Sequence, residues 1–428
     1  MKRVINYFVA GIILAGLSVT VYAQTADSPD FVSRELQIRG GLPNFMSKAN
    51  KSNSLRIAYL GGSITEQNGW RIYSLEWFKQ LFSKTEFIEI NAAIGGTGSD
   101  LGAYRLEDQV LKFSPDLVFV EFCVNDNGVS PGRIIRSMEG IVRQIWKKDP
   151  TTDICFIYTI MEDYLAKEIA GNLPESVELM EQIADRYAIP SVNYGNEVCY
   201  QIHNKRLVFK GKSKEIAGIK VFSPDGVHPY PETGQMIYHE VLTRSLKKMI
   251  QSSAQQSRPH MLPFPIDPEC FVNTRMVDIS QLHLGEGWEV LPVKDNPLFS
   301  EFTKHLEKIG KATLGSKLNF RFKGTSFGVF DVIGPGSGKV EVMIDGTVVD
   351  TIMRFDAYCT YWRKHYFIID QLEDTTHDIT IRVLPGSFDK SLILSRLNRS
   401  MKDPDEYKEY NWYAGKILID GICLSIRE

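Results

Sequence analysis

The segment LRIAYLGGS, residues 55–63, decides the predicted fold. Its first six residues form a short apolar run typical of a buried strand, and the Gly61-Gly62 pair ends that strand. Large apolar residues then recur at helical spacing, which predicts a helix from Trp70 to Phe82. The chain therefore enters its first folded unit as a strand, a glycine turn and a helix.

The same alternation of strand and helix continues along the next hundred or so residues. Further apolar runs predict strands, and the segments between them show helical spacing. The predicted strands are residues 87–91, 116–122, 153–158 and 191–193, and the predicted helices are residues 104–113, 134–147 and 175–187. Such alternation indicates an α/β domain with a parallel sheet covered by helices on both faces.

The pattern changes after about residue 250. Residues 251–268 are rich in Gln and Ser and contain four prolines, which indicates a linker. From residue 269 to residue 428 the apolar segments are short and alternating, as in 318–322, 339–344, 366–369 and 377–383, and Asp345-Gly346 is a hairpin turn signal. This alternating pattern predicts an all-β sandwich for residues 269–428. Two folded units suit a chain of 428 residues.

The N-terminus predicts an export signal. Lys2 and Arg3 precede an apolar run from Val4 to Val21, and small residues before Gln24 suit cleavage there. We therefore expect a signal peptide over 1–23, an N-terminal extension over 24–54, a first folded domain over 55–250 and a periplasmic or secreted protein. An uncleaved membrane anchor is the alternative interpretation, and the sequence contains no other candidate span.

Composition excludes several classes of partner and cofactor. With 49 basic and 52 acidic residues the net charge is −3, which disfavours binding to nucleic acid or to an anionic membrane. The six cysteines contain no CxxC pair, so we expect no essential disulfide, and we expect Cys123 and Cys155 to be buried thiols. The histidines other than His228 show no ligand-like spacing, so we expect no metal and no other cofactor.

Three residues at predicted strand ends are candidates for chemistry, because a parallel α/β sheet binds its ligand beyond the carboxyl ends of its strands. Ser63 follows Gly61-Gly62 and precedes a helix, so its hydroxyl can be exposed as a nucleophile. Gly96 lies in the turn after the second strand, and Asn125 ends the third. A backbone N–H and a side-chain amide at these two positions can donate to one substrate oxygen.

Asp225 stands three residues before His228 in the stretch SPDGVHP, residues 223–229. On a helical turn these side chains would be neighbours, so Asp225 would orient the imidazole while its other nitrogen faces Ser63. A serine hydroxyl is a weak nucleophile and needs such a base. Each of these patterns taken singly also fits an ordinary turn, helix cap or surface ion pair.

Together and in this order, these residues resemble the SGNH (GDSL-type) hydrolase family, from about Leu55 to Leu246. The resemblance implies a three-layer, flavodoxin-like domain in which Ser63, His228 and Asp225 form a catalytic triad. The Ser63 N–H, Gly96 and Asn125 would form the oxyanion hole. The GxSxG motif of α/β-hydrolases is absent.

Two positions depart from the family pattern. Gly62 replaces the usual Asp before the nucleophile, so a hydrogen-bonding carboxylate is missing there. Cys123 replaces a glycine in the block that ends at Asn125. Both departures concern the geometry of the predicted site.

Exported SGNH members with an added jelly-roll-like sandwich are similar to carbohydrate esterases, so the resemblance implies removal of acyl groups, most simply acetyl groups, from an oligo- or polysaccharide. The alternatives are a lipase or thioesterase of the same fold and a non-catalytic glycan-binding protein. In the β domain a cluster of aromatic residues is a candidate sugar-stacking platform, although sandwich cores also use such residues. Its members are Tyr358, Tyr361, Trp362, Trp412 and Tyr413.

Overall fold

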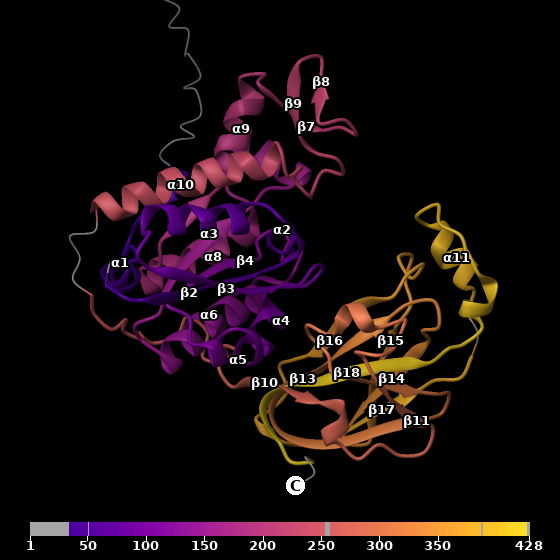
Figure 1. Cartoon of the computed structure of the whole chain (residues 1–428). Coiled ribbons are helices and arrows are strands. Elements are labelled where there is room, and N and C mark those ends of the chain that lie inside the picture. The colour runs from indigo at the N-terminus through magenta and orange to yellow at the C-terminus, as the bar shows by residue number, and fades with distance from the viewer. Residues whose placement is uncertain (1–33, 50, 253–256, 387, 426–428) are drawn as a thin grey trace, which may run out of the picture.

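The computed structural model describes residues 34–49, 51–252, 257–386 and 388–425. An α/β part is followed by a β-rich part, drawn from indigo to magenta and from orange to yellow in Figure 1. The predicted signal peptide over 1–23 lies outside the described residues. Within the described ranges, every helix is too short or too polar to cross a membrane.

The first sheet has six strands in the order β1-β6-β5-β4-β2-β3. Strands β2 to β6 are parallel, and β1 runs antiparallel to β6 at the edge. Their bounds are β1 Leu36–Gln37, β2 Ser54–Gly61, β3 Glu86–Ala93, β4 Leu117–Glu121, β5 Asp153–Tyr158 and β6 Ser191–Asn193. The predicted parallel α/β sheet is confirmed.

Helices cover both faces of this sheet, as Figure 1 shows for α3 and α10 on one side and α4 and α6 on the other. Side chains of a strand alternate between faces. In β2, Ile57 and Tyr59 therefore pack on the α3 side, and Ala58 and Leu60 pack on the α6 side. The helices of the first face are α1 Pro43–Lys48, α3 Trp70–Leu81, α9 Gly195–His203 and α10 Gly234–Ser252. Those of the second face are α4 Ser99–Tyr104, α6 Pro131–Lys148 and α8 Glu175–Tyr187.

One predicted helix is wrong as a continuous element. The segment 104–113 contains the end of α4, the short helix α5 (Leu106–Gln109) and a 3-10 turn over Leu111–Phe113. The helix breaks at Arg105, which has φ −92° and ψ 0°. The Arg105 guanidinium turns inward there and donates to the carbonyl oxygens of Gly61 and Ala92. The apolar spacing of the segment carried no sign of this buried side chain.

A small three-stranded sheet projects from the α/β domain before α10. It consists of β7 Leu207–Lys210, β8 Glu215–Ile216 and β9 Ile219–Ser223, in the order β7-β9-β8. Strand β9 leads directly into the Asp225–His228 segment. This arm therefore delivers the two residues to the rim of the main sheet.

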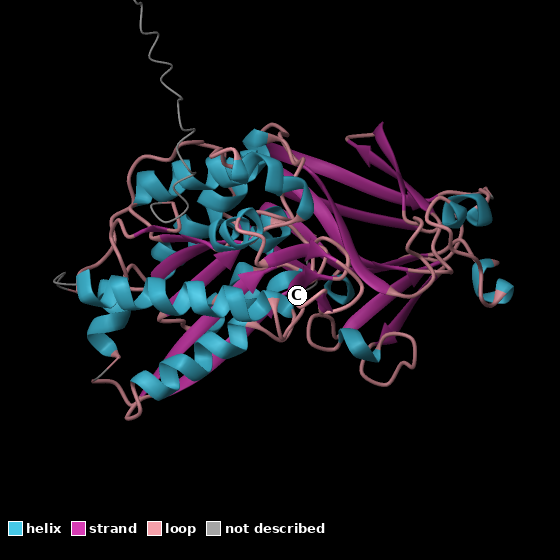
Figure 2. Cartoon of the chain, turned by 90° about the horizontal axis from the view of Figure 1, so that it is seen from above, coloured by secondary structure: helices cyan, strands magenta, loops and turns pink. Residues whose placement is uncertain are grey.

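The second domain is built from antiparallel pairs, which confirms the predicted all-β fold. Strand β13 pairs with β17 through its first half and with β16 through its second half. Figure 2 shows the helices gathered in one part of the molecule and long strands dominating the other. Asp345 and Gly346 have φ of 51° and 82° at the predicted hairpin between β14 and β15. The bounds are β10 Thr274–Asp278, β11 Trp288–Pro292, β12 Lys308–Ala312, β13 Lys317–Ile333, β14 Lys339–Ile344, β15 Thr347–Met353, β16 Arg363–Ile369, β17 Thr375–Val383 and β18 Trp412–Cys423.

The two domains share buried structure. The core on the α6 side of the parallel sheet continues into the second domain through Leu306, Phe330 and Leu418. The connecting segment is also fixed, because the Glu139 carboxylate of α6 accepts from the backbone N–H groups of Ile266 and Asp267. Side chains of both domains therefore pack into one continuous core.

Candidate active site

The predicted nucleophile and oxyanion donors lie at the carboxyl edge of three neighbouring strands. Ser63 begins α2 (Ser63–Glu66) just after β2, Gly96 follows β3, and Asn125 lies in the turn after β4. The chain leaves β2 toward β3 on one side and returns to β4 on the other. This reversal of strand order is where parallel α/β sheets form their binding crevices.

The structure brings Ser63, His228 and Asp225 into one hydrogen-bonded row. Ser63 Oγ lies 2.7 Å from His228 Nε2, and His228 Nδ1 lies 2.8 Å from Asp225 Oδ2. The prediction that Asp225 and His228 share a helical turn is wrong, because the segment is a series of bends. Instead, Asp225 Oδ1 accepts from the backbone N–H groups of Val227 and His228, which folds the loop and aligns the two side chains.

The same hydrogen bonds keep Asp225 ionised. Burial alone would raise the pKa of Asp225, but the hydrogen bonds from the His228 side chain and from two backbone N–H groups lower it to about 2. A carboxylate at this position favours the His228 tautomer with a proton on Nδ1. Nε2 is then free to accept a proton from Ser63.

Two glutamine side chains join the serine turn to the histidine loop. Gln235, which is fully buried on α10, accepts from the Trp70 N–H at 2.9 Å and donates to Gln67 Oε1 at 3.0 Å. Gln67 in turn donates to the Pro229 carbonyl oxygen at 3.3 Å. These contacts fix the distance between two segments that are far apart in the sequence.

A buried carboxylate that the sequence pattern does not indicate forms hydrogen bonds to the turn that carries Ser63. Glu121 at the end of β4 accepts from Thr65 Oγ1 at 2.7 Å, from Thr159 Oγ1 at 2.8 Å and from the Gly62 N–H. It is fully buried, and burial raises its pKa. Glu121 thus supplies a hydrogen-bonding carboxylate close to the position where the family pattern has Asp and this chain has Gly62.

Glycine is also required at position 62 for a steric reason. A Cβ atom there would overlap the side-chain amide of Asn125. Gly62 therefore lets the Asn125 amide lie against the backbone just before Ser63.

The other departure from the family pattern, Cys123, is fully buried and forms two hydrogen bonds with Thr159. Its sulfur accepts from the Thr159 N–H at 3.2 Å and donates to the Thr159 carbonyl oxygen at 3.3 Å. Its thiol joins the ends of β4 and β5.

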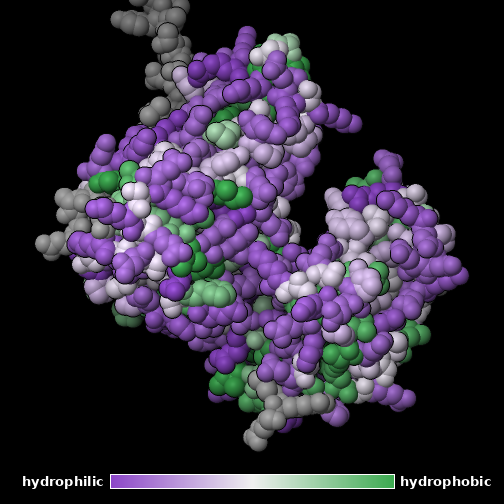
Figure 3. Space-filling view, viewed as in Figure 1, coloured by the Kyte–Doolittle hydropathy of each residue, from purple (hydrophilic) through white to green (hydrophobic). Residues whose placement is uncertain are grey.

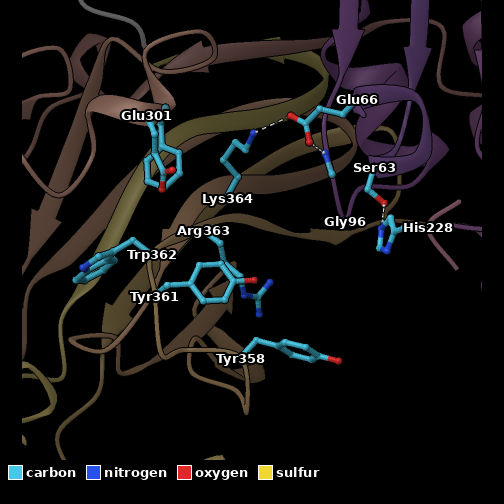
Figure 4. Close-up of a pocket in the computed structure, with 12 residues that line it drawn as sticks. Ser63, Glu66, Gly96, His228, Glu301, Tyr358, Tyr361, Trp362, Arg363 and Lys364 are labelled. Carbon is cyan, nitrogen blue, oxygen red and sulfur yellow. Dashed lines mark hydrogen bonds and ion pairs between the residues drawn. The ribbon is translucent and has the colours of Figure 1, made fainter. Parts of the chain in front are cut away.

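Ser63 lines a cavity of about 660 Å³ that lies between the two domains. Figure 3 shows the surface hollowed between the β7–β9 arm and the β-rich domain. The α/β domain supplies Ser63, Glu66, Gly95, Gly96 and His228, and the β domain supplies Glu301, Phe302, Tyr358, Tyr361, Trp362, Arg363 and Lys364. Figure 4 shows side chains of both groups pointing toward this space.

The candidate aromatic platform is divided by the structure. Tyr358 and Tyr361 are 47% and 52% exposed, and together with Trp362 they line the cavity. Trp412 and Tyr413 are 1% and 4% exposed and belong to the cores of the molecule, so assigning them to the platform was wrong. Adjacent residues of β18 point to opposite faces, and a core covers each face here, so both rings are buried. The sequence pattern does not separate them from surface aromatics.

Beside Asn125, Asp126 is a buried acid with an unusual charge state. One of its oxygens accepts from the Ser99 N–H at 2.9 Å, and the other has no hydrogen-bond partner within the part of the chain that is described. Burial raises the pKa of Asp126 to about 7. Asp126 therefore loses its proton only when the pH rises to neutrality.

Asp126 should make the protein less stable as the pH rises. Its pKa is higher in the folded chain than in the unfolded chain, so its contribution is complete below about pH 4 and is lost as the pH rises to about 7. The shift corresponds to at most about 4 kcal/mol. We expect Asp126→Asn to flatten the dependence of the unfolding free energy on pH between 4 and 8, measured by urea denaturation. Exposed Asp163→Asn is the control, and an unchanged slope in Asp126→Asn would contradict the assignment.

The sequence predicts no metal in the chain, because the histidines other than His228 show no ligand-like spacing. In the described ranges, no group of three or more His, Cys, Asp or Glu side chains is arranged to hold a metal ion. All six cysteines are buried and free in the structure, as expected for Cys123 and Cys155.

The fold and the site define the class of this protein as an acyl-removing esterase. Residues 59–234 match the model of the GDSL-like Lipase/Acylhydrolase family. The chain therefore carries a GDSL-like, SGNH-type hydrolase domain and is a carboxylic ester hydrolase. A search of curated protein sequences finds no significant match.

Solved structures share the arrangement of both domains. A two-domain esterase (CEX) described as active on acetylated mannans matches with a TM-score of 0.70 and 19% identity, over 93% of this chain and 100% of that one. The same esterase co-crystallised with mannopentaose matches with a TM-score of 0.66 and 20% identity, over 90% of this chain and 94% of that one. At this identity the likeness establishes the fold of the two domains together.

Proposed function

We propose that this protein is an exported serine esterase that removes acetyl groups from a carbohydrate through an acyl-enzyme intermediate. The observation that carries the proposal is the hydrogen-bonded row Ser63–His228–Asp225, which opens into a cavity with an aromatic wall. Export, proposed from residues 1–23, would bring the enzyme to polymeric glycans. The native mature protein should then begin near Gln24.

In the proposed reaction Ser63 Oγ attacks the ester carbonyl while His228 Nε2 takes its proton. The N–H groups of Ser63 and Gly96 and the Asn125 amide receive the negative charge that develops on the carbonyl oxygen. His228 then protonates the departing sugar hydroxyl, and Ser63 holds the acyl group as an ester. A water molecule activated by His228 attacks this ester, and Ser63 leaves with the proton as the acid is released.

The chemistry of the cavity supports a sugar with a small acyl group. None of its lining residues is aliphatic, whereas a long acyl chain requires an apolar channel. Tyr358, Tyr361 and Trp362 offer ring faces on which a sugar can stack, and the charged residues around them can bind hydroxyl groups. The CEX esterase, which has the same two-domain fold, is described as active on acetylated mannans.

The substrate proposal is tested with purified protein and a panel of esters. We expect acetate release from at least one of acetylated mannan, xylan and pectin. We also expect kcat/KM for an aryl acetate to exceed that for the aryl octanoate by roughly 10-fold or more, because the cavity offers no apolar channel in which the octanoyl chain can be buried. Faster turnover of the octanoate would favour a lipase.

A fluorophosphonate probe separates an enzyme from a glycan-binding protein, because it reacts with an activated serine. Mass spectrometry of the labelled peptide should place the adduct on Ser63. Absence of labelling together with inactivity toward every ester would contradict the proposed function.

A further inference from the structure

The loop Gly95–Gly98 has three glycines in four residues, and its Gly96 N–H is a proposed donor to the oxyanion. Gly96 has φ +72° and no heavy atom within 4 Å of the place a Cβ would occupy, so its backbone faces open space. Glycine loses more conformational freedom on folding than any other residue. A donor at this position keeps a fixed direction only if both flanks of the loop are held.

The first flank is held through Glu66, three residues after Ser63. Glu66 Oε2 accepts from the Gly95 N–H at 2.9 Å. Its other oxygen, Oε1, lies 3.5 Å from Nζ of Lys364, which comes from β16 of the second domain. Figure 4 shows both contacts as dashed lines.

The second flank is held by another residue of the same strand. The Tyr366 hydroxyl accepts from the Gly98 N–H at 3.2 Å and donates to Asp100 Oδ1 at 2.7 Å. A phenol has one proton to donate and can also accept, so this one hydroxyl satisfies both partners. Burial, followed by the charge of Asp100, raises the pKa of Tyr366, so the hydroxyl keeps its proton.

Strand β16 is itself fixed to the hydrolase domain. Lys364 and Tyr366 are two positions apart and therefore share one face of the strand. Just beyond the strand, the Asp370 carboxylate accepts from Arg133 at 2.9 Å and from Arg136 at 2.8 Å, both on α6. Strand β16 and the residue just beyond it therefore meet the first domain at three points.

We propose that the β domain is part of the catalytic apparatus, because Lys364 and Tyr366 of β16 are positioning residues for the loop that carries the Gly96 donor. The inference rests on the proposed esterase function. It assigns to the second domain a role in stabilising the transition state, in addition to the cavity wall it provides.

The direct test is Tyr366→Phe, which keeps the ring but removes the hydroxyl that accepts from the Gly98 N–H and donates to Asp100. Tyr366 is absent from the cavity lining, so substrate contact is unaffected. We expect kcat for an aryl acetate to fall about 10- to 100-fold while KM stays within about 2-fold, because a displaced donor stabilises only the transition state less well. The affinity for a boronic acid, which forms a tetrahedral anion on Ser63, should fall by a similar factor.

Tyr104→Phe is the matched control. The Tyr104 hydroxyl makes a buried hydrogen bond to Ser326 of the second domain at 2.5 Å but does not contact the Gly95–Gly98 loop. Both variants remove one interdomain hydroxyl, so both should lower the melting temperature, and only Tyr366→Phe should lower kcat. Lys364→Met is a second probe. Lys364 also lines the cavity, so a change in KM is expected for a polymeric substrate, and kcat for the aryl acetate should fall.

Three results would overturn the inference. The first is a wild-type kcat in both Tyr366→Phe and Lys364→Met, and the second is an equal loss of kcat in Tyr104→Phe. The third is a change in KM without a change in kcat in Tyr366→Phe. These outcomes are distinct from failure of the proposed function. In that case the wild-type protein would neither hydrolyse any ester nor react with a fluorophosphonate.

Discussion

Replacing Ser63 by alanine is expected to lower kcat for an aryl acetate by roughly 10⁴- to 10⁶-fold, because the acyl-enzyme can no longer form. The cavity and the oxyanion donors remain, so a small residual rate above that in water is expected. The measurement is initial-rate kinetics with purified protein at matched concentration. Fluorophosphonate labelling should disappear in the same variant.

Ser300→Ala is a suitable control for this loss. Ser300 is exposed and precedes Glu301 at the wall of the same cavity, so its substitution tests whether any serine near the site matters. Its kcat should equal that of the wild-type protein. Substantial activity in Ser63→Ala would mean that another group attacks the ester.

Asp225→Asn is expected to lower kcat by roughly 10²- to 10⁴-fold. An amide NH₂ facing His228 Nδ1 favours the tautomer with the proton on Nε2, which cannot accept the Ser63 proton. The lower part of the range reflects the 52% exposure of the Asp225 side chain, which lets water partly replace the carboxylate.

Titration of Asp225 itself should add no feature to the wild-type pH profile of kcat. With a pKa of about 2 in the folded protein, Asp225 is ionised throughout pH 5–9, so its own titration cannot shape the profile of kcat in that range. The measurement is kcat at several pH values for the variant, the wild-type protein and the exposed control Asp163→Asn. An unchanged kcat in Asp225→Asn would remove Asp225 from the proposed mechanism.

Local pattern was enough to predict most of the fold. Predicted strands such as 153–158 and 339–344 and the helix 175–187 coincide with β5, β14 and α8, because each has a regular apolar period or clear turn residues at its ends. The segment 104–113 was predicted wrongly, since its spacing is helical but Arg105 is drawn inward by carbonyl oxygens of two strands.

The candidate site was predictable only where its residues follow strand ends. Ser63, Gly96 and Asn125 meet that condition, and the three-residue spacing of Asp225 and His228 added that pair, which the family order then supported. The supporting residues Glu121, Gln235 and Tyr366 carry no such signal. Each acts through a partner far away in the sequence, and a single sequence does not indicate which distant groups will meet.

The side chains between Tyr358 and Tyr366 in the second domain differ in what they contact. Tyr358, Tyr361 and Trp362 present their rings to the cavity. Lys364, which also lines the cavity, contacts Glu66, and Tyr366 contacts the glycine loop of the hydrolase domain. Under the proposed function, evolution could therefore exchange the rings and so alter polymer preference while bond cleavage continues undisturbed. An engineer seeking a new specificity would begin with the rings and leave the two neighbours unchanged.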